Sequence, residues 1–118
     1  LEGKVITNAD FDKIRDFSEG LARVKIGKKW GYVDKNLKIA VKPQFKKCND
    51  FSEGLASIRI DNNKWGFVDK KGYLKIPPRF DDTKKFKNGL CKVIEKGLFS
   101  EKYGYIDKKG NFVYVPGN

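Results

Sequence analysis

Three aspartates recur at one place in a repeated motif, so they are the first residues to consider for metal or acid–base chemistry. Asp34, Asp69 and Asp107 each follow an aromatic–glycine segment and precede a lysine. An aspartate in this setting is typical of a turn, because its carboxylate can accept hydrogen bonds from the backbone that follows it. No second carboxylate recurs beside these three, so the pattern predicts neither a catalytic dyad nor a calcium loop.

Cysteine chemistry has little support in the sequence. Cys48 and Cys91 are the only cysteines, too few for a disulfide framework, and histidine is absent. The commonest activating base for a thiol and the commonest zinc ligand are therefore both missing. Cys91 stands where other copies of the repeat have alanine, which indicates a small buried side chain. We predict no catalytic, cofactor-binding or metal-binding residue, and a protein that is not an enzyme.

A serine–glutamate pair also recurs, as Ser18-Glu19 and Ser52-Glu53, each time before a glycine. Serine needs an adjacent base to act as a nucleophile, and none accompanies these pairs. The third copy replaces the pair with Lys87-Asn88. We interpret the pair as a turn sequence rather than as an active site.

Lysine gives the one positive indication of a binding surface. The chain has 118 residues, with 26 basic and 15 acidic side chains and a formal net charge of +11, which favours anionic partners. One row of lysines precedes each aromatic–glycine segment and another follows it: Lys29, Lys64 and Lys102, then Lys35, Lys70 and Lys108. Such rows could engage nucleic acid or an anionic cell-envelope polymer. Alternatively, they only flank strands, where lysine discourages edge pairing.

The segment that must position all these residues is a heptapeptide. Its three copies are KWGYVDK at 29–35, KWGFVDK at 64–70 and KYGYIDK at 102–108. They recur about every 35 residues, a period typical of a repeat architecture. We expect a single domain over 1–118, with full repeats at 30–64 and 65–102 and partial repeats at 3–29 and 103–116.

Within one repeat, the pattern alternates strands and turns. Residues 56–60 alternate apolar and polar side chains, the pattern of a half-buried strand. A turn leads to the strand at 65–69, Asp69 to Gly72 form a second turn, and residues 73–76 form a third strand that prolines end. Each repeat is therefore predicted to be a three-stranded antiparallel meander followed by a turn-rich segment.

Aromatic and leucine positions that recur in phase are expected to form a continuous core. These are Trp30, Trp65, Leu21, Leu55 and Leu90. We expect one helical turn in the turn-rich segment at Asn8 to Phe17 and in each of its equivalents. The longest hairpin turn holds Leu98 and Phe99, which we predict to be either a local packing device or a contact point.

These motifs resemble the WG (KWG) repeat family of bacterial proteins. The residues that carry the resemblance are the heptapeptides, PQF at 43–45, PPRF at 77–80, and FSEGLA at 17–22 and 51–56. The resemblance covers nearly the entire chain; Tyr103 in place of tryptophan is one departure. It implies a repeat architecture, and it brings no catalytic residues.

The predicted fold class is all-β, with tandem meanders of about 35 residues in an open stack. The alternative is a closed pseudo-threefold barrel or propeller-like ring, since each end of the chain holds elements that the other lacks. Residues 3–6 and 111–115 occupy the same place in the repeat, however, so closure would leave one strand too many. This favours the open form.

Two functions follow from these features. The first is a non-enzymatic binding module that presents a β surface to a protein partner; the alternative is a basic module that binds a polyanion through the lysine rows. No stretch is apolar enough to span a bilayer. No signal peptide is visible after Leu1, but a mature form or an excised piece would both begin this way, so the compartment and the oligomeric state stay open.

Overall fold

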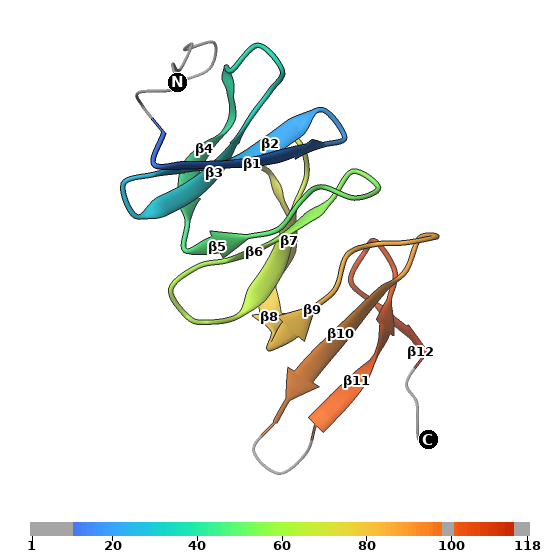
Figure 1. Ribbon diagram of the computed structural model, residues 1–118. Coiled ribbons are helices and arrows are strands. Elements are labelled where there is room, and N and C mark those ends of the chain that lie inside the picture. The colour runs from blue at the N-terminus through green and yellow to red at the C-terminus, as the bar shows by residue number, and fades with distance from the viewer. Residues whose placement is uncertain (1–10, 98–100, 115–118) are drawn as a thin grey trace.

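The structure is a computed structural model that describes residues 11–97 and 101–114. Within these ranges the regular structure consists of strands alone, arranged in three antiparallel four-stranded sheets that follow one another along the chain (Figure 1). We call each sheet with its turns a unit. The described residues hold no helix long and apolar enough to cross a membrane.

Each unit contains four consecutive strands. The first contains β1 (Lys13–Ser18), β2 (Leu21–Ile26), β3 (Lys29–Val33) and β4 (Ile39–Phe45). The second contains β5 (Lys47–Cys48), β6 (Ala56–Arg59), β7 (Trp65–Val68) and β8 (Leu74–Phe80). The third contains β9 (Asp82–Thr83), β10 (Cys91–Lys96), β11 (Glu101–Ile106) and β12 (Phe112–Tyr114). Strand order follows chain order in every sheet, so each is a simple meander.

The first strand of each unit adds to the predicted meander of three. β1, β5 and β9 come from the segment that the sequence indicated to be rich in turns, and each pairs antiparallel with the strand after it. The helical turn expected within Asn8 to Phe17 is wrong for the described residues, because β1 begins at Lys13. β5 and β9 have only two residues each, too few for periodicity to reveal.

The three units form an open stack. The molecule measures 51 × 28 × 20 Å along its principal axes. β1 and β12 lie at opposite ends of the stack (Figure 1). Among the residues that the structure describes, each pairs only with its neighbour in its own sheet. The all-β open repeat is thereby confirmed, and the closed ring is wrong.

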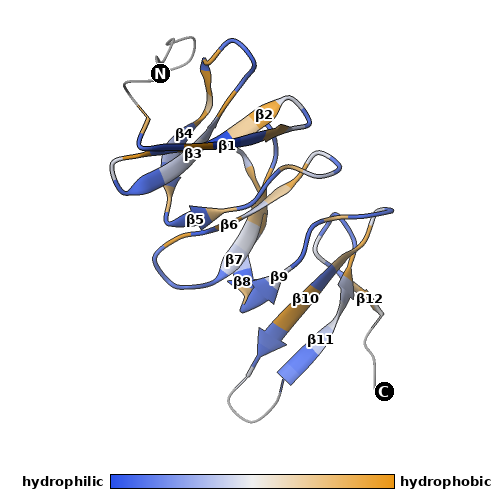
Figure 2. Ribbon diagram, viewed as in Figure 1, coloured by the Kyte–Doolittle hydropathy of each residue, from blue (hydrophilic) through white to orange (hydrophobic). Residues whose placement is uncertain are grey.

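Two apolar clusters join the units. One combines first-unit and second-unit side chains: Leu21, Tyr32, Val41, Phe45, Cys48, Phe51, Ala56, Ile58 and Val68. The other does the same for the second and third units: Leu55, Phe67, Ile76, Phe80, Phe86, Cys91, Val93 and Ile106. Figure 2 shows hydrophobic residues concentrated on strands such as β2 and β10, which lie inside their sheets. Burial of this apolar surface between units is what holds the stack together.

The predicted core residues are buried to different degrees. Leu21 and Leu55 are buried, as expected, but Leu90 is 37% exposed. Trp30 and Trp65 are only partly buried and pack at the rim of the clusters. Leu90 belongs to the last unit, so no following unit among the described residues covers it. Trp30 is the second residue of β3 and Trp65 the first of β7, so each lies near the start of its strand.

Candidate functional site

The serine–glutamate turns join consecutive units, a role that the sequence analysis missed. The Glu19 carboxylate accepts hydrogen bonds from the backbone N–H groups of Glu53 and Gly54, at 2.6 and 2.9 Å. The Ser18 hydroxyl donates to the Phe51 carbonyl at 2.8 Å. We call this arrangement the inter-unit clasp. It ties the turn between the first two strands of one unit to the same turn of the next.

The clasp occurs again between the second and third units. The Glu53 carboxylate accepts from the N–H groups of Asn88 and Gly89, at 2.6 and 2.8 Å, and the Ser52 hydroxyl donates to the Phe86 carbonyl at 2.7 Å. Two N–H groups on one carboxylate form charge-assisted hydrogen bonds, which are about twice as strong as neutral ones. The recurrence of the pair at repeat spacing was the signal that could have indicated this contact.

Two of the predicted polyanion-binding lysines belong to the clasps. Lys70 Nζ lies 3.6 Å from Glu19 Oε1 and donates to the Glu19 carbonyl at 2.8 Å. Lys108 Nζ lies 3.6 Å from Glu53 Oε1. Each of these ammonium groups therefore neutralises a carboxylate of the unit before it in the same molecule.

The clasps lower the pKa of both glutamates. Partial burial acts to raise the pKa of Glu19, but the N–H groups of Gly54 and Glu53, with Lys70, outweigh it and hold the pKa below its ordinary value of 4.5. For Glu53 the N–H of Gly89 is the main cause of a lowered pKa, opposed by desolvation and reinforced by Asn88 and Lys108. Both side chains are thus held as carboxylates.

Replacing Glu19 with glutamine is expected to lower the free energy of unfolding at neutral pH and to make it depend less on pH in the acidic range. The native carboxylate has a lower pKa than the unfolded one, so the unfolded state binds more protons and stability falls as pH drops below about 5. Glu19→Gln removes this linkage. Because the side chain is a third exposed, we expect a loss of only about 0.5–1 kcal/mol at pH 7. Urea unfolding at several pH values measures both effects.

Glu101→Gln is the matched control for this experiment. The Glu101 carboxylate lies 3.9 Å from Lys96 Nζ, both side chains are about half exposed, and it has no part in a clasp. This variant keeps Glu19 and should keep the acid dependence of the wild type. An equal flattening in both variants would contradict the role given to the clasp.

The other predicted site residues lie in separate places. Lys64 Nζ pairs with Asp81 Oδ1 at 2.6 Å, and Lys29 Nζ lies 3.8 Å from Asp61 Oδ1. Lys102 Nζ sits 5.0 Å from the centre of the Phe112 ring. Lys35 is exposed. Leu98 and Phe99 lie outside the described residues.

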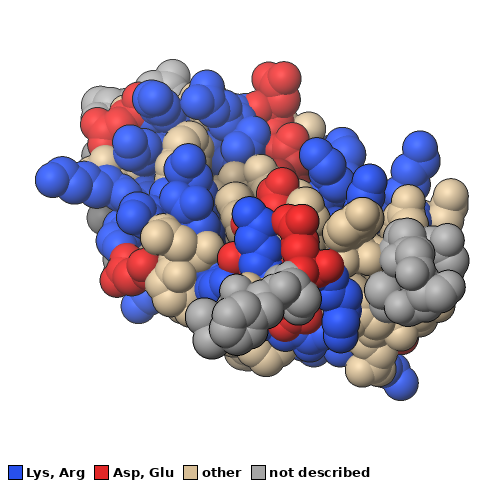
Figure 3. Space-filling view, turned by 90° about the horizontal axis from the view of Figure 1, so that it is seen from below, with Lys and Arg blue, Asp and Glu red and all other residues tan. Residues whose placement is uncertain are grey.

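Surface charge is mixed on the face that Figure 3 displays. Lysine and arginine spread over much of this face, and acidic side chains lie among them. Four of the six predicted lysines are within ion-pair distance of a carboxylate. A polyanion would have to compete with these contacts for the ammonium groups.

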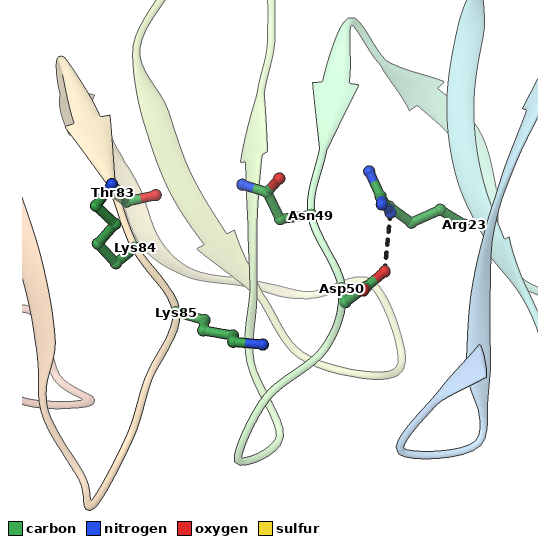
Figure 4. Close-up of a pocket in the computed structure, with 6 residues that line it drawn as sticks. All are labelled: Arg23, Asn49, Asp50, Thr83, Lys84 and Lys85. Atoms are coloured by element: carbon green, nitrogen blue, oxygen red, sulfur yellow. Dashed lines mark hydrogen bonds and ion pairs between the residues drawn. The ribbon is translucent and has the colours of Figure 1, made fainter. Parts of the chain in front are cut away.

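A groove of about 380 Å³ is lined by residues from all three units (Figure 4). Its lining consists of Arg23, Asn49, Asp50, Thr83, Lys84 and Lys85. Arg23 comes from β2, the next two from the segment after β5, and the last three from β9 and the segment after it. Because it is built only when successive units stack, the groove is a property of the array rather than of one repeat.

Some polar groups of the groove are already paired. Arg23 Nε forms an ion pair with Asp50 Oδ1 at 2.9 Å, and Arg23 Nη1 donates to the Cys48 carbonyl at 3.1 Å. Asn49 Nδ2 donates to Ser57 Oγ at 2.8 Å. These contacts fix the wall that the first two units provide.

Other polar side chains of the groove have no hydrogen-bond or ion-pair partner among the described residues. Thr83 Oγ1 is buried without a hydrogen-bond partner, although buried hydroxyls normally have one. Lys84 and Lys85 are exposed. In Figure 4, Thr83 and Lys85 lie on one side and Arg23 on the other, with Asn49 and Asp50 between them. The arrangement offers the two exposed ammonium groups to an anionic group, whereas the Thr83 hydroxyl is buried.

Comparison with known proteins identifies the repeat. A family model described as WG containing repeat matches the chain three times in succession, at residues 1–30, 30–65 and 65–99. The chain belongs to the WG containing repeat family. No curated protein and no solved structure matches it. The match is to a repeat module rather than to an enzyme family.

The recurring aspartates of this WG-repeat chain are turn residues, as predicted. One carboxylate oxygen of Asp34, Asp69 and Asp107 accepts hydrogen bonds from the N–H groups two and four residues later, at 2.8–3.0 Å. Among the residues that the structure describes, no group of three or more acidic or cysteine side chains is arranged to hold a metal.

Both cysteines of the WG-repeat chain lie in the apolar clusters. Burial raises the pKa of Cys48 to about 11 and that of Cys91 to about 12. The thiols therefore stay protonated at neutral pH, whereas a nucleophilic cysteine needs a lowered pKa. This matches the small buried side chain predicted for Cys91.

Proposed function

We propose that this WG-repeat chain is a non-enzymatic binding module that presents a β surface to a protein partner. The observation that carries the proposal is the groove, which exists only where successive units stack. Two exposed lysines and an unpartnered threonine hydroxyl line it. A carboxylate is the protein group that accepts hydrogen bonds from both kinds of donor. The partner segment therefore carries an aspartate or glutamate that enters the groove.

The unpartnered hydroxyl supports a ligand-binding role over a purely structural one. A buried donor that lacks a partner costs about 1–3 kcal/mol. Because the Thr83 hydroxyl is buried, a carboxylate recovers part of this cost only if the groove wall moves to expose it. Arg23 adds little attraction, because Asp50 already neutralises it. Lys84 and Lys85 are thus the charges that select an anionic side chain.

Replacing both groove lysines is expected to abolish most of this binding. The probe is a fluorescein-labelled short poly-glutamate peptide, followed by fluorescence anisotropy. K84E/K85E should bind it at least about tenfold more weakly than the wild type, since a tenfold change needs only about 1.4 kcal/mol. Failure of the wild-type chain to bind the peptide would contradict an acidic partner segment.

The control variant K28E/K71E carries the same change in net charge outside the groove. Lys28 and Lys71 are exposed turn residues. We expect this variant to stay within about twofold of wild-type affinity, because a distant exposed charge is screened by salt. Equal losses in both variants would show that overall charge binds the peptide, and would refute the groove.

The polyanion alternative remains a second proposal, on the net charge of +11. It predicts that a duplex DNA oligonucleotide binds wild type with strong salt dependence and that both double variants weaken it alike. The groove proposal predicts that only K84E/K85E affects the peptide. The same two variants with two probes therefore separate the functions.

A further inference from the structure

The outer face of the first unit exposes apolar positions that are buried in the other two. Ile14 is 43% exposed and Phe17 is 44% exposed. The equivalent residues of the later units are at most 8% exposed: Cys48, Phe51, Thr83 and Phe86. Cys48 and Phe51 pack in a cluster with side chains of the first unit, and Phe86 packs in a cluster with side chains of the second. The first unit thus presents a complete unit-to-unit interface with nothing among the described residues on it.

The polar half of the same interface is also present. In each clasp a glutamate accepts hydrogen bonds from two adjacent N–H groups in the turn of the next unit. The lysine that ends the heptapeptide of that next unit lies beside the same carboxylate. The corresponding groups of the first unit are the N–H groups of Glu19 and Gly20 and the ammonium group of Lys35. The turn has the same backbone conformation, with φ of 54° and 84° against 55° and 84° at Glu53 and Gly54. No described residue provides an acceptor for these N–H groups.

We infer that this N-terminal face, formed by Ile14, Phe17, the Glu19–Gly20 turn and Lys35, docks the last unit of a second WG-repeat protein that ends in a Ser-Glu-Gly-Leu turn. The glutamate of that turn would occupy the two N–H groups beside Lys35. The leucine would cover Phe17, as the buried Leu21 and Leu55 belong to the clusters that face their next units. This surface is separate from the groove, so the inference does not rest on the proposed function.

The last turn of this chain excludes a second wild-type copy as the occupant. It carries Lys87-Asn88 where the earlier turns have Ser-Glu. It therefore offers no carboxylate, and Lys87 would bring a second positive charge toward Lys35. The third unit keeps an exposed apolar surface at this interface, which includes Leu90 and Tyr105. Its charge pattern, however, opposes docking on the N-terminal face of a second copy. The first unit would thus accept a clasp, whereas the third unit has no glutamate in this turn with which to form one.

Restoring the pair by K87S/N88E should turn the chain into its own partner. The new glutamate of one copy would dock on the N-terminal face of the next, and a head-to-tail contact that does not close makes chains. We expect sedimentation velocity to show a mass that grows with concentration, with association at least about tenfold tighter than for K87S/N88Q. K87S/N88Q is the matched control, because it removes Lys87 equally but supplies no carboxylate.

Two added substitutions locate the contact. K35E and F17D each alter an exposed residue of the N-terminal face, so the fold should tolerate them. Either one, placed in the K87S/N88E background, should return the mass to that of the monomer. Added wild type should shorten the chains, since it docks on a free Ser-Glu turn and offers none. The inference is overturned if K87S/N88E sediments like K87S/N88Q, or if K35E and F17D leave the association unchanged.

Discussion

Replacing Phe67 with alanine should lower the free energy of unfolding by about 3–5 kcal/mol, the range for removing a buried aromatic ring. Phe67 is 1% exposed and lies in the cluster between the second and third units. Its ring packs edge-to-face on Phe86 at 5.0 Å and on Phe80 at 6.5 Å between ring centres. The cavity would open in the middle of the stack, where neither unit can close it without moving the other. Urea unfolding followed by circular dichroism measures the loss.

Trp65→Ala provides the comparison for Phe67→Ala. The motif alone points to Trp65 as the core residue, yet its ring is only partly buried, and the Arg59 guanidinium lies 5.8 Å from the ring centre. We expect a loss of about 1–3 kcal/mol, because the exposed part of the ring contributes little to burial. If the urea midpoint of Trp65→Ala were at or below that of Phe67→Ala, the partly exposed tryptophan at the edge of the cluster would contribute more to stability than the buried phenylalanine inside it.

The difference between these aromatic residues explains what the sequence could reveal about the core. Side chains alternate between the two faces of a strand, so Trp65 and Phe67 lie on one face of β7, and both contact the same cluster. Periodicity reports which face is inward, but not how far along the strand the neighbouring unit reaches. That reach depends on how the sheets stack, which no local pattern describes. Hence the last three strands of each unit and the open repeat were predictable, whereas the short first strand and the ranking of burial along the strands were not.

Neither the clasp nor the groove could be predicted from the sequence, and the reasons are opposite. Ser18-Glu19 recurs, but its partners are backbone N–H groups of the next turn, and backbone groups leave no residue pattern. The groove residues do not recur: Asn49 and Lys84 occupy equivalent positions in different copies. Aligning the copies therefore reveals the recurring residues that build the sheets and turns, and it overlooks the positions that differ between units. Those variable positions are where one repeat array can differ from another in what it binds.

Gly66→Ala should be as damaging as the loss of Phe67, about 3 kcal/mol or more, although it adds a single carbon. A Cβ at Gly66 would lie 2.5 Å from the Ile76 carbonyl oxygen and 2.8 Å from the Pro78 nitrogen. The obstacle is backbone rather than a side chain that can turn aside, so overpacking here reaches the upper end of its usual cost. The glycine of the motif is therefore fixed by the irregular pairing of β7 with β8, whose register shifts between Trp65 and Phe67.

Gly54→Ala separates this steric cause from the conformational demands on glycine. Gly54 has a φ of 84°, and a Cβ there would meet nothing within 4 Å. Its replacement should cost only about 1–2 kcal/mol, from the left-handed backbone conformation. Denaturation midpoints for the two variants test the assignment, and Gly66→Ala should have the lower one. A smaller loss for Gly66→Ala than for Gly54→Ala would mean that β8 can move away from β7, and that the close approach of these strands does not explain the glycine of the motif.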